Sequence, residues 1–218
     1  MKQFPKIQCD TVSCVGDSIT AGYYDEEGLG WVSRLSAKTA KECSKRYTFY
    51  NLGVGNDTTI DAWHYFGHQL ENVFTSVLLI HIGVNDTSIN LTGEGRHTRL
   101  SIGESFSKWS WMAWEAKKRK YKTLIISPLP VQEDEIFFTP YPDNPKDCKG
   151  IIYSNKEILN YVNRLDDFCK EQDLPFLRLY EDWLGSDCYA DGLHPNAKGH
   201  QRLAEQIFSK LHELEFLK

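Results

Sequence analysis

Five short segments rich in apolar and β-branched residues recur along the chain, and stretches with helical spacing separate them. They are Thr11–Val15, Tyr47–Leu52, Val77–Ile82, Thr123–Ser127 and Phe176–Leu179. Most are apolar at consecutive positions, which is typical of strands buried on both faces. Because such strands belong to parallel sheets covered by helices on each side, the pattern predicts an α/β fold. We expect a three-layer α/β/α sandwich with a central parallel five-stranded sheet, for which a flavodoxin-like strand order is a common solution.

Two of the intervening stretches predict helices with clear boundaries. The first follows Ser154, with Glu157 three residues later as in a capping box, and its apolar positions are Ile158, Tyr161, Val162, Leu165, Phe168 and Cys169. The second runs from Leu203 to Leu214, with Asn196 as its expected N-cap. Both patterns present one apolar stripe, so we expect both helices to pack on the sheet.

The length of 218 residues suits one α/β domain, and we expect residues 1–218 to form it, because no linker or internal repeat interrupts the pattern. Two stretches are too long for simple connections, Thr87–His97 and Pro130–Gly150. Each follows the carboxyl end of a predicted strand, where open parallel sheets bind ligands. The second stretch is expected to form a pocket wall or a lid.

Charge and hydropathy exclude several classes of partner. The net charge is −5 and the basic residues are scattered apart from one short cluster, Lys117-Lys118-Arg119-Lys120, so no nucleic-acid partner is expected. No segment is long and apolar enough to predict a transmembrane helix. The first residues, Met1–Lys6, lack the apolar core of a signal peptide, which predicts a cytoplasmic protein. His64, His68, His81 and His200 lack metal-ligand spacing with nearby Asp, Glu or Cys, so no metal is expected.

Candidate groups for nucleophilic catalysis lie near the two ends of the chain. Ser18 follows the first predicted strand within Gly16–Thr20, and the run Asp191–Pro195 contains His194. A serine hydroxyl is a poor nucleophile at neutral pH unless a base takes its proton, and a histidine oriented by a carboxylate is the usual base. The chain therefore holds all three groups of a serine hydrolase.

Four short motifs, each at the end of a predicted strand or the start of a helix, occur in a characteristic order. They read Gly16-Asp17-Ser18, Gly53-Val54-Gly55-Asn56, Gly83-Val84-Asn85-Asp86 and Asp191-Gly192-Leu193-His194. This set resembles the SGNH, or GDSL-type, esterase and lipase family, and the resemblance spans nearly the whole chain. It implies the SGNH hydrolase fold and hydrolysis of a small-molecule carboxylic ester without a cofactor. One departure is Ile19 in place of leucine, an apolar change that leaves the reacting groups alone.

The resemblance also implies a role for each matched residue. Ser18 corresponds to the nucleophile, His194 to the general base and Asp191 to the carboxylate that orients the imidazole. Gly55, through its backbone N–H, and Asn85, through its side-chain amide, correspond to oxyanion-hole donors, and the Ser18 N–H completes the hole. Such fixed donors stabilise the negative charge of a tetrahedral intermediate, each by about 3 kcal/mol.

Other interpretations of the same residues stay open. Each motif alone fits an ordinary turn or helix cap. An acyltransferase would use the same three groups with an alcohol or amine as acceptor, and a non-catalytic binding module would keep only the fold. A flavodoxin-like nucleotide binder fits the architecture, but the chain lacks a phosphate-binding glycine loop. The acyl and alcohol parts of the substrate, and the oligomeric state, are not indicated by the sequence.

Overall fold

The main sheet has the five parallel strands that the sequence predicts. The computed structural model describes residues 10–92, 95–133 and 148–218. The strands of the main sheet are β1 (Asp10–Gly16), β2 (Tyr47–Gly53), β3 (Val77–His81), β6 (Lys122–Ile126) and β8 (Phe176–Leu177). They pair in the order β2-β1-β3-β6-β8, all in parallel. Numbered within this sheet alone, the order is 2-1-3-4-5, which is the flavodoxin-like arrangement. The predicted fold class is confirmed.

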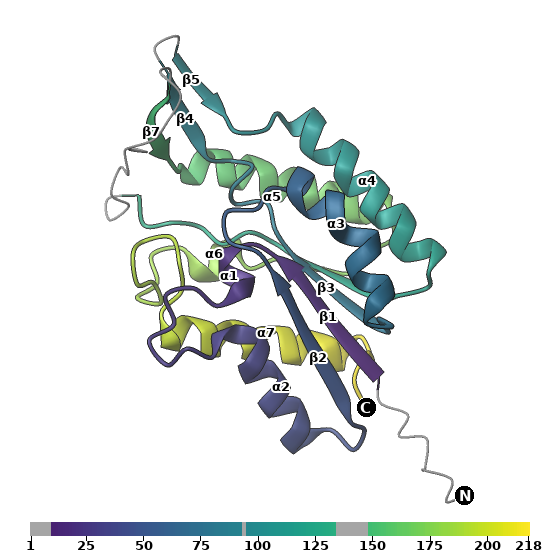
Figure 1. Cartoon of the computed structure of the whole chain (residues 1–218). Helices are drawn as coiled ribbons and strands as arrows, with labels where there is room; N and C mark the ends of the chain where they lie inside the picture. Colours follow the sequence, from purple (N-terminus) through teal and green to yellow (C-terminus); the bar gives the residue numbers. More distant parts are fainter. Residues whose placement is uncertain (1–9, 93–94, 134–147) are drawn as a thin grey trace, which may run out of the picture.

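Helices cover both faces of this sheet and make three layers (Figure 1). One layer contains α2 (Gly30–Glu42) and α7 (Ala197–Glu213). The opposite layer contains α3 (Thr59–Asn72), α4 (Ile102–Lys118) and α5 (Asn155–Glu171). Two single-turn helices, α1 (Ser18–Ala21) and α6 (Tyr180–Trp183), lie in the connections.

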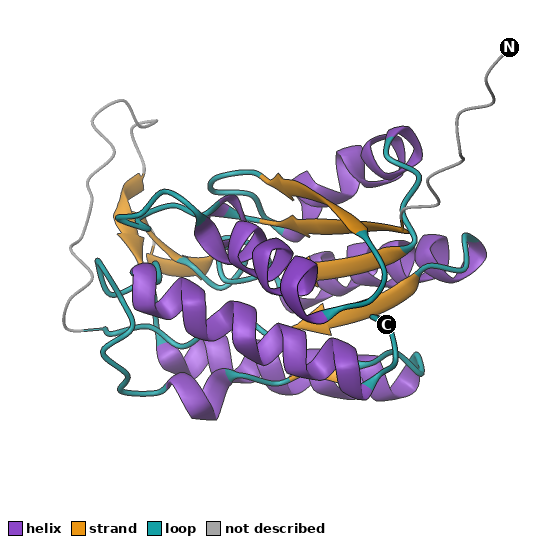
Figure 2. Cartoon of the chain, turned by 90° about the horizontal axis from the view of Figure 1, so that it is seen from below, coloured by secondary structure: helices purple, strands orange, loops and turns teal. Residues whose placement is uncertain are grey.

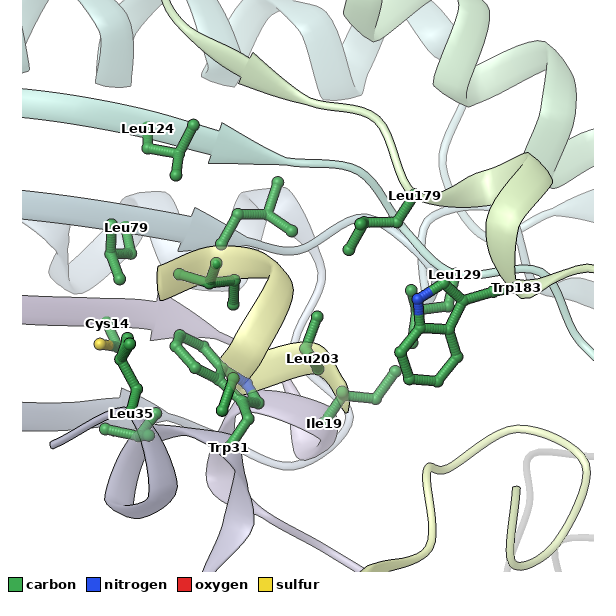
Figure 3. Close-up of a cluster of buried hydrophobic side chains, with 14 of the residues drawn as sticks. Cys14, Ile19, Trp31, Leu35, Leu79, Leu124, Leu129, Leu179, Trp183 and Leu203 are labelled. Carbon is green, nitrogen blue, oxygen red and sulfur yellow. The ribbon is translucent and has the colours of Figure 1, made fainter. Parts of the chain in front are cut away.

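Successive side chains of the inner strands enter two separate cores, which is why these strands are apolar at consecutive positions. In β1, Val12 and Cys14 pack on the side of α2 and α7, whereas Val15 packs on the side of α3 and α4. In β3, Leu79 packs on the side of α2 and α7, and Leu78 packs on the opposite side. Figure 3 shows part of the first core, where the strand residues Cys14, Leu79 and Leu124 lie near the helix residues Trp31, Leu35 and Leu203.

The two predicted helices are present, but only one has its predicted cap. Asn196 caps α7, because its side chain accepts a hydrogen bond from the Gly199 N–H at 2.9 Å. Helix α5 follows Ser154 as expected, yet the Ser154 side chain makes no capping hydrogen bond, so the predicted capping box is wrong. The Asn155 N–H is bonded instead to the carboxylate of Glu133. The Glu133 carboxylate therefore replaces the expected Ser154 side chain as an acceptor at the start of α5.

A second, smaller sheet was not predicted. It pairs β4 (Ile89–Thr92), β5 (Gly95–Thr98) and β7 (Cys148–Ile152) in the order β5-β4-β7, with antiparallel neighbours. It lies beyond the carboxyl ends of the main strands (Figures 1 and 2). Both long stretches noted in the sequence contribute to it, although most of the expected pocket wall or lid, residues 134–147, lies outside the described residues. Within the described parts of the chain, no helix has the length and apolar character needed to cross a bilayer.

Candidate active site

Ser18 lies at the carboxyl end of β1, where the chain turns at once into α1 (Figure 1). The turn is tight, because a Cβ on Gly16 would lie 2.1 Å from Thr20 Oγ1 and 2.3 Å from the His81 carbonyl oxygen. Only glycine fits there. Asp17 is the N-cap of α1, and its carboxylate accepts the Ile19 N–H at 3.0 Å. Ser18 is therefore the first residue of the helix, where a backbone N–H has no intrahelical acceptor.

The structure brings Ser18, His194 and Asp191 together in one hydrogen-bonded chain. Ser18 Oγ lies 2.8 Å from His194 Nε2, across 176 positions of sequence. His194 Nδ1 lies 2.7 Å from Asp191 Oδ2. A carboxylate can only accept at this contact, so Nδ1 carries the proton and Nε2 is left to accept the hydroxyl of Ser18. This is the tautomer that a general base requires.

The turn that carries His194 is organised by Asp191. Its second oxygen accepts the backbone N–H groups of Leu193, at 3.0 Å, and of His194, at 2.7 Å. Partial burial raises the pKa of Asp191, but hydrogen bonds from the His194 side chain and backbone outweigh this, and the net pKa lies below its usual value. Asp191 is thus ionised at neutral pH, as an acceptor for the imidazole must be.

Asn85 lies in the turn after β3, and two groups set the position of its side chain. The side chain is buried, with 3% of the residue exposed. Its Nδ2 donates to the Asp57 carbonyl at 2.9 Å, and its Oδ1 accepts the Tyr153 hydroxyl at 2.9 Å. These two contacts fix which end of the amide is nitrogen, and they leave one amide hydrogen for a further acceptor.

Gly55 lies in the loop after β2, under the ring of Tyr23. A Cβ on Gly55 would lie 2.8 Å from the Tyr23 hydroxyl oxygen and 2.9 Å from two ring carbons. The same loop is joined to the turn before Ser18, because the Val54 N–H donates to the Gly16 carbonyl at 3.0 Å. Glycine at this position therefore lets an aromatic ring and the backbone approach closely.

Three buried carboxylates surround the site. Burial is the largest influence on Asp17, Asp57 and Asp86, and it raises the pKa of each; for Asp17 the value is about 7. Asp86 accepts hydrogen bonds from the Thr59 backbone and hydroxyl, from Ser105 and from Tyr161. These partners come from α3, α4 and α5. Asp86 therefore joins three helices to the turn that carries Asn85.

The raised pKa of Asp17 predicts a dependence of stability on pH. Between about pH 4 and 7 the folded protein keeps a proton on Asp17 that the unfolded chain has released, so this group's contribution to the free energy of unfolding falls as pH rises. Asp17→Asn keeps the capping oxygen but does not ionise. The free energy of unfolding of the variant minus that of the wild type should rise by on the order of 2–4 kcal/mol across this interval. Urea titrations at half-unit pH steps measure it, and parallel curves would contradict it.

Several residues near the site were not predicted from the sequence. Tyr153 has no motif around it, and its position follows from the second sheet, which the sequence did not indicate. Tyr23 and Tyr24 directly follow the Ser18 motif, but nothing in their spacing predicts contact with His194. Among residues 10–92, 95–133 and 148–218, no group of three or more His, Cys, Asp or Glu could hold a metal ion.

Comparisons with known proteins identify the family. Residues 14–202 match the sequence profile of the GDSL-like lipase/acylhydrolase family. A GDSL esterase/lipase of Arabidopsis thaliana is 24% identical over 90% of this chain and 62% of its own length. A GDSL esterase/lipase of Oryza sativa subsp. japonica is 27% identical over 65% of this chain and 55% of its own length. The matches thus span about three fifths of the length of these relatives.

The fold has solved counterparts. The crystal structure of a lipase/acylhydrolase from Enterococcus faecalis superposes with a TM-score of 0.73, covering 96% of this chain and 97% of that one, at 22% sequence identity. At that identity the likeness concerns the fold, and the sequence profile carries the assignment. Since the profile covers the four motifs from Ser18 to His194, the chain belongs to the GDSL-like lipase/acylhydrolase family.

Proposed function

We propose that this protein is a serine hydrolase that cleaves the carboxylic ester bond of a small acyl ester. The observation that carries the proposal is the hydrogen-bonded chain from Ser18 Oγ through His194 to Asp191, with contacts of 2.8 and 2.7 Å. Serine esterases need a nucleophile, a base and a carboxylate in this order. The family to which the chain belongs supports the same class of reaction.

In the proposed reaction, Ser18 Oγ attacks the acyl carbonyl carbon while His194 Nε2 takes the hydroxyl proton. The negative charge that develops on the carbonyl oxygen is stabilised by the backbone N–H groups of Ser18 and Gly55 and by the side-chain amide of Asn85. His194 then gives its proton to the departing alkoxide, and an acyl-enzyme forms. Asp191 holds the imidazole in its required tautomer during both transfers.

Water completes the cycle. His194 removes a proton from a water molecule as the water oxygen attacks the acyl-enzyme, and the second tetrahedral intermediate is held by the same three donors. Its collapse breaks the bond to Ser18 Oγ, which regains a proton from His194, and the carboxylic acid is released. The proposed mechanism uses only groups of this chain, water and the ester.

A fluorophosphonate probe tests this proposal directly. The wild-type protein should be labelled at Ser18, with the adduct located by mass spectrometry of the peptide that contains it. A panel of p-nitrophenyl esters of increasing acyl length should then show turnover, and the length profile reports the acyl pocket. Folded protein that is neither labelled nor active would contradict the proposal and favour a binding module. If added alcohols compete with water and yield new esters as the main product, the protein is an acyltransferase with the same acyl-enzyme.

Tyr153→Phe tests whether the Tyr153 hydroxyl holds the Asn85 side chain in position. The change removes the hydroxyl that donates to Asn85 Oδ1 at 2.9 Å, so the amide is held by one contact fewer. We expect kcat for a p-nitrophenyl ester to fall about three- to tenfold, the value of one ordinary hydrogen bond, with KM little changed. Tyr180→Phe is the matched control, because it loses a hydroxyl that donates to the Asn155 carbonyl at 3.0 Å. Equal kcat values in the two variants would show that Tyr153 does not act through Asn85.

A further inference from the structure

The loop between α1 and α2 places two exposed tyrosines against the candidate active site. The ring of Tyr24 stacks on the imidazole of His194, with 4.6 Å between the ring centroids and 19° between the planes. Tyr23 lies beside it, with its centroid 6.5 Å from that of His194. Tyr24 is 56% exposed, so burial in a core does not explain its position.

Tyr24 also has a disfavoured backbone conformation. Its φ is +62°, in the left-handed region, where a residue with a Cβ atom is strained. Such a conformation persists only where the surrounding structure holds it, and it is often found at functional sites. Tyr24 is one of several described residues with such a φ, and its ring is the one that stacks on His194.

The loop is closed at its base by two glycines. A Cβ on Gly22 would lie 3.0 Å from the Gly30 Cα, and both residues have positive φ, so the two backbones touch. Inside the loop, the carboxylate of Asp25 accepts the N–H groups of Glu27, at 2.9 Å, and of Gly30, at 2.8 Å. It also pairs with Arg34 at 3.0 Å. The pKa of Asp25 lies below its usual value, because these hydrogen bonds outweigh the effect of burial.

The loop is also tied to the start of α7, which follows His194 in sequence. Glu26 accepts the Ala197 N–H at 2.6 Å. His200 Nε2 lies 3.2 Å from the Tyr23 carbonyl oxygen, to which it donates when protonated at Nε2. His200 is fully buried. The tyrosines and His194 are therefore fixed to the same part of the molecule.

We propose that Tyr24 is a positioning residue for the catalytic imidazole. The contacts of His194 to Ser18 and Asp191 act at the two ring nitrogens, so they define an axis but leave the ring free to tilt about it. An aromatic ring packed on one face restrains that tilt, and it keeps water from that face. The strained loop places Tyr24 where it can do so. This inference rests on the proposed function, because it assumes that His194 is the base.

Three substitutions of Tyr24 test the inference, measured with the p-nitrophenyl ester panel. Tyr24→Ala and Tyr24→Gly should lower kcat/KM about tenfold to a hundredfold, the range expected when a reacting group is poorly oriented. The loss should lie in kcat, with KM changed by less than about threefold, because the proposed role of Tyr24 is to orient the imidazole and not to bind the substrate. Tyr24→Phe keeps the stacked ring and should retain most of the activity. The rate of fluorophosphonate labelling should follow kcat in each variant.

Phe74→Gly provides a matched control for strain. Phe74 also has a left-handed φ, +51°, and is 87% exposed, but it lies after α3 and outside the candidate site. Replacement by glycine relieves strain at either position, so both variants should unfold at the wild-type temperature or above it. Only Tyr24→Gly should lose activity, which separates the effect on the imidazole from any loss of stability.

Several outcomes would overturn the inference. Tyr24→Ala and Tyr24→Gly with kcat/KM close to wild type would show that the imidazole needs no stacked ring. A rise in kcat/KM would show that the ring obstructs the site. A loss in Tyr24→Phe as large as in Tyr24→Ala would assign the effect to the hydroxyl. Each of these leaves the proposed function intact if wild-type Ser18 is labelled, whereas an unlabelled and inactive wild type would overturn the proposed function itself.

Discussion

Replacement of Ser18 by alanine is expected to lower kcat for p-nitrophenyl esters by at least about 10⁴-fold, because the proposed mechanism forms the acyl-enzyme on the Ser18 hydroxyl. The variant should also fail to react with the fluorophosphonate probe. The fold should be unaffected, since the change removes one side-chain hydrogen bond, to His194, and keeps Asp17 as the cap of α1. Alanine is also favourable at a helical position. Steady-state kinetics and thermal unfolding of the same preparation measure both effects.

Ser13→Ala is the matched control for this experiment. Ser13 lies in β1, five positions before Ser18, and is fully buried, with its hydroxyl 2.7 Å from that of Thr75. Its loss should lower the free energy of unfolding by about 1–3 kcal/mol, as for a buried hydrogen bond left incomplete, and leave kcat unchanged. Ser18→Ala should lose kcat and keep its stability, whereas Ser13→Ala should lose stability and keep its kcat. This contrast separates an effect on the reaction from an effect on the fold. Wild-type esterase activity in Ser18→Ala would exclude Ser18 as the nucleophile.

Those parts of the fold that arise from local pattern could be predicted from the sequence. Segments rich in apolar and β-branched residues marked all five strands of the main sheet, and most of them are apolar at consecutive positions because each inner strand must fill a core on both faces. The strands of the smaller sheet show no comparable apolar pattern in the sequence. Its strand β4 has only four residues, Ile89–Thr92, two of them polar, and pairs with β7 from a segment more than fifty positions away. Pairing of that kind depends on the tertiary structure and not on local propensity.

The candidate site, like the fold, could be predicted only in part from the sequence. Ser18 and His194 were matched through motifs, and the structure places them 2.8 Å apart. The residues around them were not predicted, because their positions depend on contacts between segments that are far apart in the sequence. Tyr153, which directly follows β7, donates a hydrogen bond to Asn85. Tyr24, in the loop after α1, stacks on His194 near the other end of the sequence. The capping box at Ser154 failed for a related reason, since Glu133 supplies the acceptor from a distant segment. Motifs thus identify groups that react, while the groups that hold them depend on the fold.

The second large effect is expected at Asn85. Its Nδ2 is held by the Asp57 carbonyl and its Oδ1 by the Tyr153 hydroxyl, both at 2.9 Å, so the amide is oriented before a substrate binds. A donor fixed in this way stabilises the developing oxyanion without reorganising, and removal of such a donor typically lowers kcat by about 10²–10³-fold. Asn85→Ala should show this loss in kcat with little change in KM. Labelling by the fluorophosphonate, whose reaction also places charge on an oxygen, should slow in parallel.

Asn85→Ala should also destabilise the fold, because it removes the hydrogen bonds to the Asp57 carbonyl and from the Tyr153 hydroxyl, and this effect needs its own control. Asn155→Ala loses a comparable pair of amide contacts, since Asn155 accepts the Val131 N–H and donates to the Val131 carbonyl, both at 2.8 Å. Both variants should unfold at lower urea concentration than the wild type, by about 1–3 kcal/mol in the free energy of unfolding. Only Asn85→Ala should lose the greater part of kcat. A kcat within about threefold of wild type, in a protein still labelled at Ser18, would mean that the backbone N–H groups stabilise the oxyanion without Asn85.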